Sequence, residues 1–179
     1  MRSYSPTLLA LILGLAVSSY AAAAGYEYTE PKNEAERAEL IRDMIGSSQY
    51  KLALEQVQKG LKANPKSAQL KFQQAVLYER LGQTERAKAL FEDFINTYPE
   101  IVEPYNNLAA IYAAEGNTAK AREWLTRAVT VNPNFAMGYE NLGNLELEQA
   151  LSYYRQALKA KPSDKRMQRK VASLEKLLQ

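Results

Sequence analysis

The sequence predicts an all-α protein built from consecutive helical hairpins, and three observations carry that prediction. Equivalent residues recur every 34 positions, and a repeat period of this length is typical of stacked helix pairs. Glycine and proline alternate at the points where a first and a second helix would end. Hydrophobic residues make up 46% and charged residues 24% of the 179 residues, which is ordinary for a folded domain and too apolar for a disordered one. The clearest recurring sets are Pro65, Pro99 and Pro133; Ala53, Ala87 and Ala121; Val57, Phe91 and Leu125; and Ser48, Gly82 and Gly116.

The chain begins with the three-part pattern of a secretory signal peptide. Arg2 is the only charged residue before Glu27, and the apolar run 8–17 is followed by the small residues 21–24. A run of about ten apolar residues is short for a membrane-spanning helix, which needs roughly twenty. We therefore expect cleavage after Ala23 or Ala24, so that 1–24 is removed and the protein is exported to the bacterial periplasm. An uncleaved membrane anchor is the alternative, because 7–24 carry no charge.

A tether at 25–33 precedes the first expected helix. Pro31 prevents a helix upstream, and Asn33 with Glu36 three residues later forms the pattern of a capping box. From there the repeat predicts helix pairs at 34–46 and 50–63, at 68–81 and 84–97, and at 102–115 and 118–131. Small residues should allow the two helices of a pair to approach, namely Ala75, Ala109 and Gly143 on the first and Ala53, Ala87, Ala121 and Ala150 on the second.

The third unit reads Tyr105-x-x-Leu108-Ala109-x-x-Tyr112, followed by Gly116, Ala121, Leu125, Ala128 and Pro133, and the fourth begins Tyr139-x-x-Leu142-Gly143. This pattern resembles the tetratricopeptide repeat (TPR) family over about 34–162. The resemblance is weaker in the first unit, where Arg37, Leu40, Ile41 and Met44 occupy the early positions. It implies a right-handed superhelical solenoid at 34–164, with units at about 34–67, 68–101, 102–135 and a shortened 136–164.

The fourth unit lacks five residues. Ala121 to Ala150 and Pro133 to Pro162 are both 29 apart instead of 34, and the glycine turn is missing. Either a tight turn keeps the helix pair, or the two helices fuse over about 136–160. The strong helix formers at 145–151 favour fusion. A fused helix cannot fold back on itself, so Leu151, Tyr154 and Leu158 would need another partner.

That partner is expected to be a C-terminal helix at 165–179, capped by Ser163 or Asp164. Its apolar residues lie on one face at helical spacing: Met167, Val171, Leu174 and Leu178. We interpret it as the capping helix that covers the open end of a repeat array. The alternative is a self-association surface made of this helix and the fused one.

First helices line the inner wall of such a solenoid, which makes their exposed residues the candidate groove for a partner. Amide side chains donate and accept hydrogen bonds, so a series of them can bind the backbone of an extended peptide. In the family such positions contact peptides, although a solvated default surface explains the same residues. The pattern of Lys, Arg and Asn with which some family members hold an acidic C-terminus is not met here, because Ala38, Arg42, Gln73, Glu103 and Asn107 occupy those places. The predicted groove residues are Phe72, Gln73, Val76, Arg80, Asn106, Asn107, Ala110, Asn141 and Asn144.

Basic residues gather near the C-terminus, opposite the apolar stripe of the last helix. They predict either a solvated face or a weak contact with an anionic envelope surface, through Lys165, Arg166, Arg169 and Lys170. The net charge of +3 is too small to indicate nucleic-acid binding.

The chain contains no Cys and no His, which removes thiol nucleophiles, histidine-based catalysis and the usual zinc sites. No phosphate-binding loop or calcium loop is present, so we expect no enzyme activity, no catalytic residues, no metal and no cofactor. The sequence thus predicts a periplasmic scaffold or adaptor that binds an extended segment of an envelope protein during assembly of an envelope machine. Two alternatives are a self-associating structural subunit that pairs through 136–178, and a chaperone or regulatory subunit of an envelope enzyme.

Overall fold

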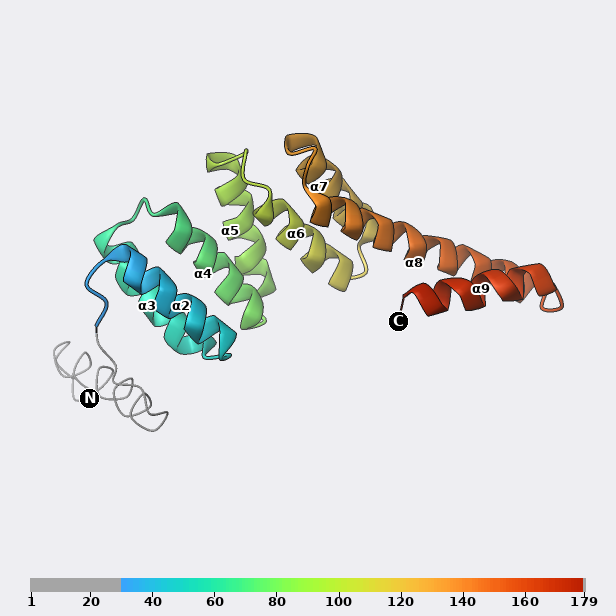
Figure 1. Cartoon of the computed structure of the whole chain (residues 1–179), viewed down its shortest axis with the longest axis horizontal. Helices are drawn as coiled ribbons and strands as arrows, with labels where there is room; N and C mark the ends of the chain where they lie inside the picture. Colours follow the sequence, from blue (N-terminus) through green and yellow to red (C-terminus); the bar gives the residue numbers. More distant parts are fainter. Residues whose placement is uncertain (1–29, 179) are drawn as a thin grey trace, which may run out of the picture. The chain divides into compact units, whose positions relative to one another are not determined.

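The computed structural model describes residues 30–178 (Figure 1), and every regular element in that range is a helix. The predicted signal peptide and most of the tether lie outside the described residues. Two compact units divide the chain, 1–83 and 84–179, with the boundary in the turn of the second predicted hairpin. We describe each unit by itself, and the pairing of the two helices on either side of that boundary stays a prediction. Within 30–178 we find no helix with both the length and the apolar character needed to cross a bilayer.

The first unit contains α2 (Glu34–Gly46), α3 (Tyr50–Ala63) and α4 (Ala68–Arg80), close to the bounds that the 34-residue period predicts. Helix α3 packs against both α2 and α4. The helices bury a common apolar core, because the residues that recur along one face of each helix point inward. This core consists of Ile41, Met44, Ala53, Val57, Leu70 and Leu77.

The predicted cap of α2 is present in a modified form. The Asn33 side chain accepts a hydrogen bond from the Glu36 backbone N–H at 2.9 Å. The Glu36 carboxylate accepts from the Asn33 side-chain amide at 3.0 Å and from the Lys32 backbone N–H at 2.9 Å. These bonds satisfy N–H groups that have no partner inside the helix, and so they fix where α2 starts.

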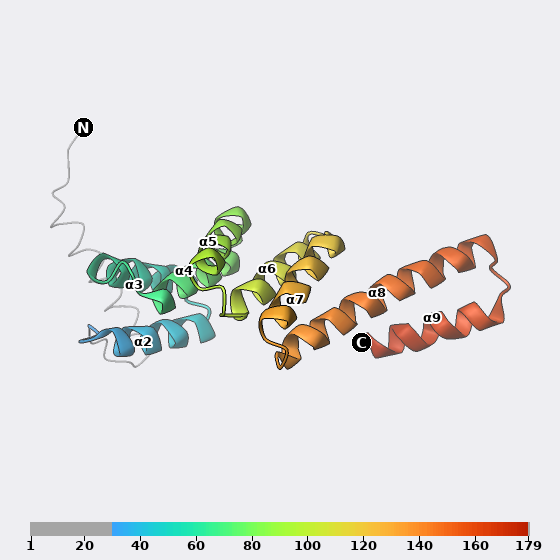
Figure 2. The same ribbon diagram turned by 90° about the horizontal axis from the view of Figure 1, so that it is seen from above.

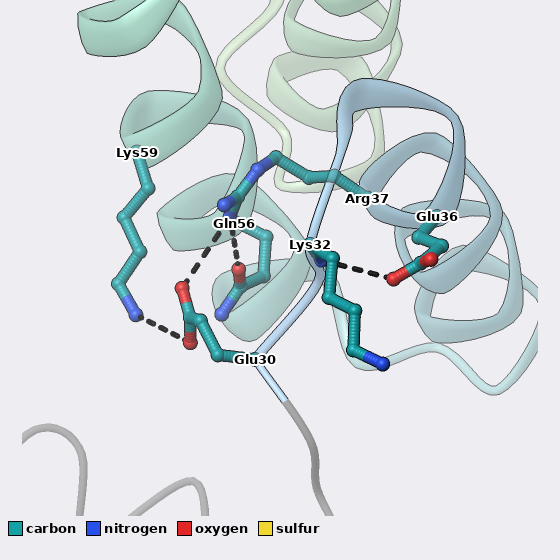
Figure 3. Close-up of polar contacts among 6 residues, drawn as sticks. All are labelled: Glu30, Lys32, Glu36, Arg37, Gln56 and Lys59. Carbon is teal, nitrogen blue, oxygen red and sulfur yellow. Dashed lines mark hydrogen bonds and ion pairs between the residues drawn. The ribbon is translucent and has the colours of Figure 1, made fainter.

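A polar network holds the segment before α2 against α3 (Figure 3). Arg37 donates to the buried Gln56 at 2.8 Å, and Glu30 lies 3.7 Å from Arg37 and 3.5 Å from Lys59. Glu34 accepts from Asn64 at 2.7 Å and also from the Ser67 hydroxyl. The segment at 30–34 is therefore fastened to its own repeat, and its acidic side chains are engaged within it.

The second unit contains α5 (Thr84–Thr97), α6 (Glu103–Ala114), α7 (Thr118–Val131), α8 (Ala136–Ala160) and α9 (Lys165–Leu177). Each of these helices packs against the next in the chain. The buried residues of the second unit are mostly those that recur every 34 positions: Ala87, Phe91, Tyr105, Leu108, Ala109, Ala121, Leu125 and Ala128.

The first helix of each of the first three repeats ends in a left-handed turn, as the sequence predicts. Gly82 and Gly116 have φ values of 71° and 76°, and Ser48, the residue of the same column in the first repeat, has φ 59°. The residue after each turn closes it with a backbone bond, for example from Asn117 N–H to the Tyr112 carbonyl at 2.8 Å. This position of the repeat thus adopts a positive φ in all three repeats, even in the first, where the residue is serine.

Helix α8 runs without interruption for 25 residues, which confirms the fusion and excludes the tight turn. Its second half extends past α7, and α9 folds back beside it (Figures 1 and 2). Asp164, not Ser163, caps α9 by accepting the N–H groups of Arg166 and Met167. The expectation for the fourth helix pair is wrong. Gly143 and Ala150 do not allow two helices to approach, because both lie on the continuous α8. A Cβ on Gly143 would meet nothing within 4 Å.

Candidate functional site

The predicted groove residues are distributed over both units. Phe72, Gln73, Val76 and Arg80 lie on α4 in the first unit, and the remaining five lie on α6 and α8 in the second.

On α4 the central amide is not available to a partner. Gln73 is only 7% exposed, and its Nε2 donates to the Ala38 carbonyl of α2 at 3.2 Å. Its Oε1 is buried without a hydrogen-bond partner within the described residues. Gln73 therefore braces α4 against α2, contrary to the expected exposed position. Phe72 and Val76 are half-buried and Arg80 is exposed.

In the second unit, α6 and α8 present amide side chains that face one another. Asn141 donates to the Asn106 side-chain oxygen at 2.7 Å, and the Asn106 amide points to the Met137 sulfur at 3.7 Å. Asn107 is half-buried beside this pair, and Ala110 and Asn144 are exposed. We call these five residues the amide face: Asn106, Asn107, Ala110, Asn141 and Asn144.

The bonds of Gln73 and Asn141 follow one rule. Each links a first helix to the first helix of the preceding repeat, and each spans 35 residues. At these two positions the amides thus hold consecutive repeats together, whereas the sequence predicted either a partner-binding surface or a solvated one. Asn107 and Asn144 are the members of the amide face for which the structure leaves a binding role most open.

A hollow of about 180 Å³ opens beside the amide face. Its walls come from α6, α7 and α8, and its lining is mostly small or apolar. Met137, which is 54% exposed and lies against Asn106, is not among the predicted groove residues. Its position beside the column of amides, one turn before Asn141, was the available signal. The lining residues are Ala109, Ala110, Ala113, Leu125, Asn141, Asn144, Leu145 and Glu148.

This arrangement suits recognition of a polypeptide. Amides offer both donors and acceptors to a peptide backbone, while the hollow and Met137 offer apolar contact to a side chain. Within 30–178 no three carboxylates gather where they could hold a metal ion.

Three groups in the described range have clearly shifted pKa values, and all lie outside the amide face. Hydrogen bonds from Ser67 and Asn64 lower the pKa of Glu34. Carboxylates of Glu85 and Glu115 raise the pKa of Lys88. The backbone N–H of Met167 lowers the pKa of the capping residue Asp164. None of these causes indicates a catalytic acid or base.

The four predicted cations of α9 are all exposed, and they do not form one patch with a common pocket. Arg166, Arg169 and Lys170 line a hollow of about 430 Å³ with Tyr154 of α8. Lys170 donates to the Tyr154 hydroxyl at 3.0 Å and lies 4.6 Å from the centre of its ring. Lys165 lines a separate hollow together with Arg169. We call Lys165, Arg166, Arg169 and Lys170 the α9 basic surface, and its contact with an anionic surface stays a prediction.

Comparison with known proteins connects this geometry to a family. Residues 72–134 match the family model described as tetratricopeptide repeat. A thermophilic TPR protein of Thermus thermophilus is 20% identical with a TM-score of 0.59, and the match covers 81% of this chain and 82% of that one. PilF of Pseudomonas aeruginosa is 19% identical with a TM-score of 0.57, over 77% of this chain and 65% of that one.

A third similar structure contains a bound peptide. The first TPR domain of Spaghetti (RPAP3), solved with the HSP90 peptide SRMEEVD, is 19% identical with a TM-score of 0.56, over 64% of this chain and 90% of that one. This chain spans 22%, 59% and 65% of the length of three of the matched chains, the last of them PilF. At these identities the similarity establishes the fold.

Proposed function

Because this chain belongs to the tetratricopeptide repeat family, we propose that it binds other proteins and catalyses no reaction of its own. Two facts support the proposal. The fold is one that holds a peptide in the similar RPAP3 structure. The chain also contains neither His nor Cys, so most enzyme mechanisms lack their usual residues.

The amide face is the proposed binding surface for an extended segment of the partner. The observation that carries this is the Asn141–Asn106 bond, which holds two amides in fixed orientation beside the 180 Å³ hollow. The bond links α6 to α8, so a peptide that binds across the two helices would not have to order them first. Asn107 and Asn144 would bind the peptide backbone, and the hollow with Met137 would accept a small apolar side chain.

An acidic C-terminal tail, such as the HSP90 peptide in the RPAP3 structure, is a poor candidate for this surface. Glu103 is exposed on α6, the helix that carries Asn106 and Asn107. Its negative charge would repel an acidic peptide from the amide face.

The proposal also includes the compartment in which the protein acts. The N-terminal pattern at 1–24 supports export across the inner membrane to the bacterial periplasm, where the partner would be an envelope protein that takes part in assembling an envelope machine. A chaperone or regulatory subunit of an envelope enzyme would use the same surface. Fractionation tests this setting: the mature protein should leave with the periplasm and begin near Gly25, and a chain retained in the membrane with residues 1–24 would contradict it.

The binding surface is tested with the double variant Asn107→Ala/Asn144→Ala, which spares the bracing pair Asn106–Asn141. The matched control is Glu92→Ala/Glu123→Ala, two exposed residues of α5 and α7. Proteins captured from envelope extract are identified, and the segment they share is synthesised as a peptide for calorimetry. We expect the amide variant to bind this peptide at least tenfold more weakly and the control to bind it as wild type does. If the amide variant keeps the wild-type affinity, the amide face is not the binding surface.

A further inference from the structure

Helix α8 joins two segments that are separate helices in the third repeat. Its first half corresponds to α6 at a step of 34, and its second half to α7 at a step of 29. In the third repeat, α6 and α7 are packed neighbours and hide the residues between them. Tyr105 is 3% exposed, Ala109 and Leu125 are each 2% exposed, and Ala128 is 0% exposed.

Three of the corresponding residues of α8 are left uncovered, whereas Tyr154, which corresponds to Leu125, is half-buried beside α9. Tyr139, which corresponds to Tyr105, is 52% exposed, and Gly143 faces open space. Ala157, which corresponds to the buried Ala128, is exposed, and the neighbouring Tyr153 is 61% exposed. Helix α8 therefore carries both surfaces that pack against each other in the third repeat, one on its first half and one on its second. Neither surface has the other packed against it.

One copy of the chain cannot bring the two halves together. Tyr139 and Ala157 lie 18 positions apart on the same helix, which separates them by about 27 Å at the rise of an α-helix. We propose that two copies of this chain pair antiparallel through α8, so that residues 147–160 of each copy complete the fourth repeat of the other.

The positions of the repeat define how the two copies would align. Because α6 and α7 run antiparallel, Tyr105 lies beside the end of α7, and Tyr112 beside its start. Transferred to α8, this alignment places Tyr139 opposite Ala157 of the second copy, Gly143 opposite Tyr154 and Glu146 opposite Ala150. Each of the first two contacts sets a large side chain against a small one. The midpoint of each of these three residue pairs lies near residue 148. A single two-fold axis through that point would therefore generate the same contacts in both copies, as a closed dimer requires.

Charge also favours the antiparallel arrangement. The first half of α8 carries only acidic charged residues, Glu140, Glu146 and Glu148, and the second half only basic ones, Arg155 and Lys159. Antiparallel pairing sets the acidic half beside the basic half and opposes the two helix dipoles, whereas parallel pairing would set like charges together. Glu146 pairs with Arg122 at 2.7 Å and Arg155 with Glu175 at 2.6 Å, and their side chains remain 59% and 57% exposed.

Helix α9 leaves most of this interface uncovered. It packs against the second half of α8, where Leu151 is buried and where Lys170 bonds to Tyr154 beside Ala150. Tyr139, Gly143 and Ala157 stay exposed beside it. It takes the place that the first helix of a following repeat would occupy, so it can stay in position while a second copy covers Tyr139 and Gly143.

Since the chain has no cysteine, any disulfide that forms in a variant must involve the introduced cysteines. The variant Tyr139→Cys/Ala157→Cys should form an intermolecular disulfide and run as a covalent dimer under mild oxidation. The matched control, Ser152→Cys alone on another face of α8, should stay largely monomeric on a non-reducing gel. A disulfide within one chain would show that α8 folds back in solution, and either that result or no disulfide at all overturns the proposal.

Two further variants keep the test independent of crosslinking. Gly143→Arg fills open space in one copy but blocks Tyr154 of the second, whereas Ser152→Arg adds the same side chain at an exposed position away from the interface. Inserting Ala-Glu-Gly-Asn-Thr, the sequence of 114–118, after Leu147 restores the missing turn and allows each chain to complete its own fourth repeat. Light scattering after size exclusion should show a dimer for wild type and Ser152→Arg, and monomers of unchanged helical content for the other two. A monomeric wild type at 200 µM, or a dimer that survives both changes, would overturn the proposal.

Discussion

Replacing Gly116 by alanine isolates the energy of the left-handed turn that ends the first helix of a repeat. Gly116 has φ 76°, and a Cβ at this position would meet nothing within 4 Å. The substitution therefore causes no collision, and its effect comes from the backbone alone. Gly46→Ala is the matched control, because Gly46 also faces open space but belongs to helix α2 and has no positive φ.

The two substitutions should have opposite signs. An L-residue in the left-handed region costs about 1–2 kcal/mol, and loss of glycine's freedom in the unfolded chain returns about 0.4–1 kcal/mol. Gly116→Ala should thus lower the free energy of unfolding by about 1 kcal/mol. Gly46→Ala should raise it by about 0.5 kcal/mol, because alanine has the higher helix propensity. Ser48, already at φ 59°, gives the reverse experiment, and Ser48→Gly should stabilise by about 0.5–1 kcal/mol.

Urea unfolding followed by circular dichroism at 222 nm measures all three variants against wild type. Equal effects of Gly116→Ala and Gly46→Ala would refute the reasoning, since the two differ only in backbone conformation. Ser48→Gly also removes an exposed hydrogen bond from the Tyr50 hydroxyl at 3.3 Å. Tyr50→Phe measures that loss, and a Ser48→Gly variant that destabilises by more than Tyr50→Phe would refute the reasoning as well.

The remaining predictions concern the core, pH and surface charge. Phe91→Ala, at a fully buried position, should cost about 3–5 kcal/mol in urea unfolding, whereas the exposed neighbour Glu92→Ala should change little. The lowered pKa of Glu34 means that its bonds to Ser67 and Asn64 stabilise the fold above the ordinary glutamate pKa and are lost as the pH falls through the lowered value. Glu34→Gln should flatten this acid dependence, and an unchanged pH profile would contradict it. Vesicles rich in anionic phospholipid should bind through the α9 basic surface, and changing its four cations to glutamine should abolish the binding. Cosedimentation that persists in 1 M NaCl would contradict an electrostatic contact.

The helix bounds of the fold could be predicted from sequence because the determinants are local. A residue that must adopt positive φ, a proline that cannot continue a helix and a side chain that caps an N-terminus act within a few positions of themselves. Ser48, Gly82 and Asp164 all act in this way. The same columns showed that five residues were missing at the turn of the fourth unit, which left a tight turn or a fused helix. The strong helix formers at 145–151 favoured the fused helix that the structure has.

The candidate site was predicted only in part, because periodicity tells which face a residue occupies but not what it touches there. Gln73 and Asn141 occupy the expected column, yet each bonds to the preceding first helix. Met137 was missed because its contact with Asn106 joins residues 31 positions apart.

The sequence by itself determined that the chain forms helices of the TPR type and where the helices up to residue 131 start and end. It also showed that the residue types histidine and cysteine are absent. Only the tertiary structure decided which amides brace neighbouring repeats, and that α8 leaves one of its faces without the helix that would normally cover it. The physical reason is the range of the interactions. Backbone conformation and capping are settled within a turn of helix, whereas burial depends on which distant segment of chain arrives to exclude water.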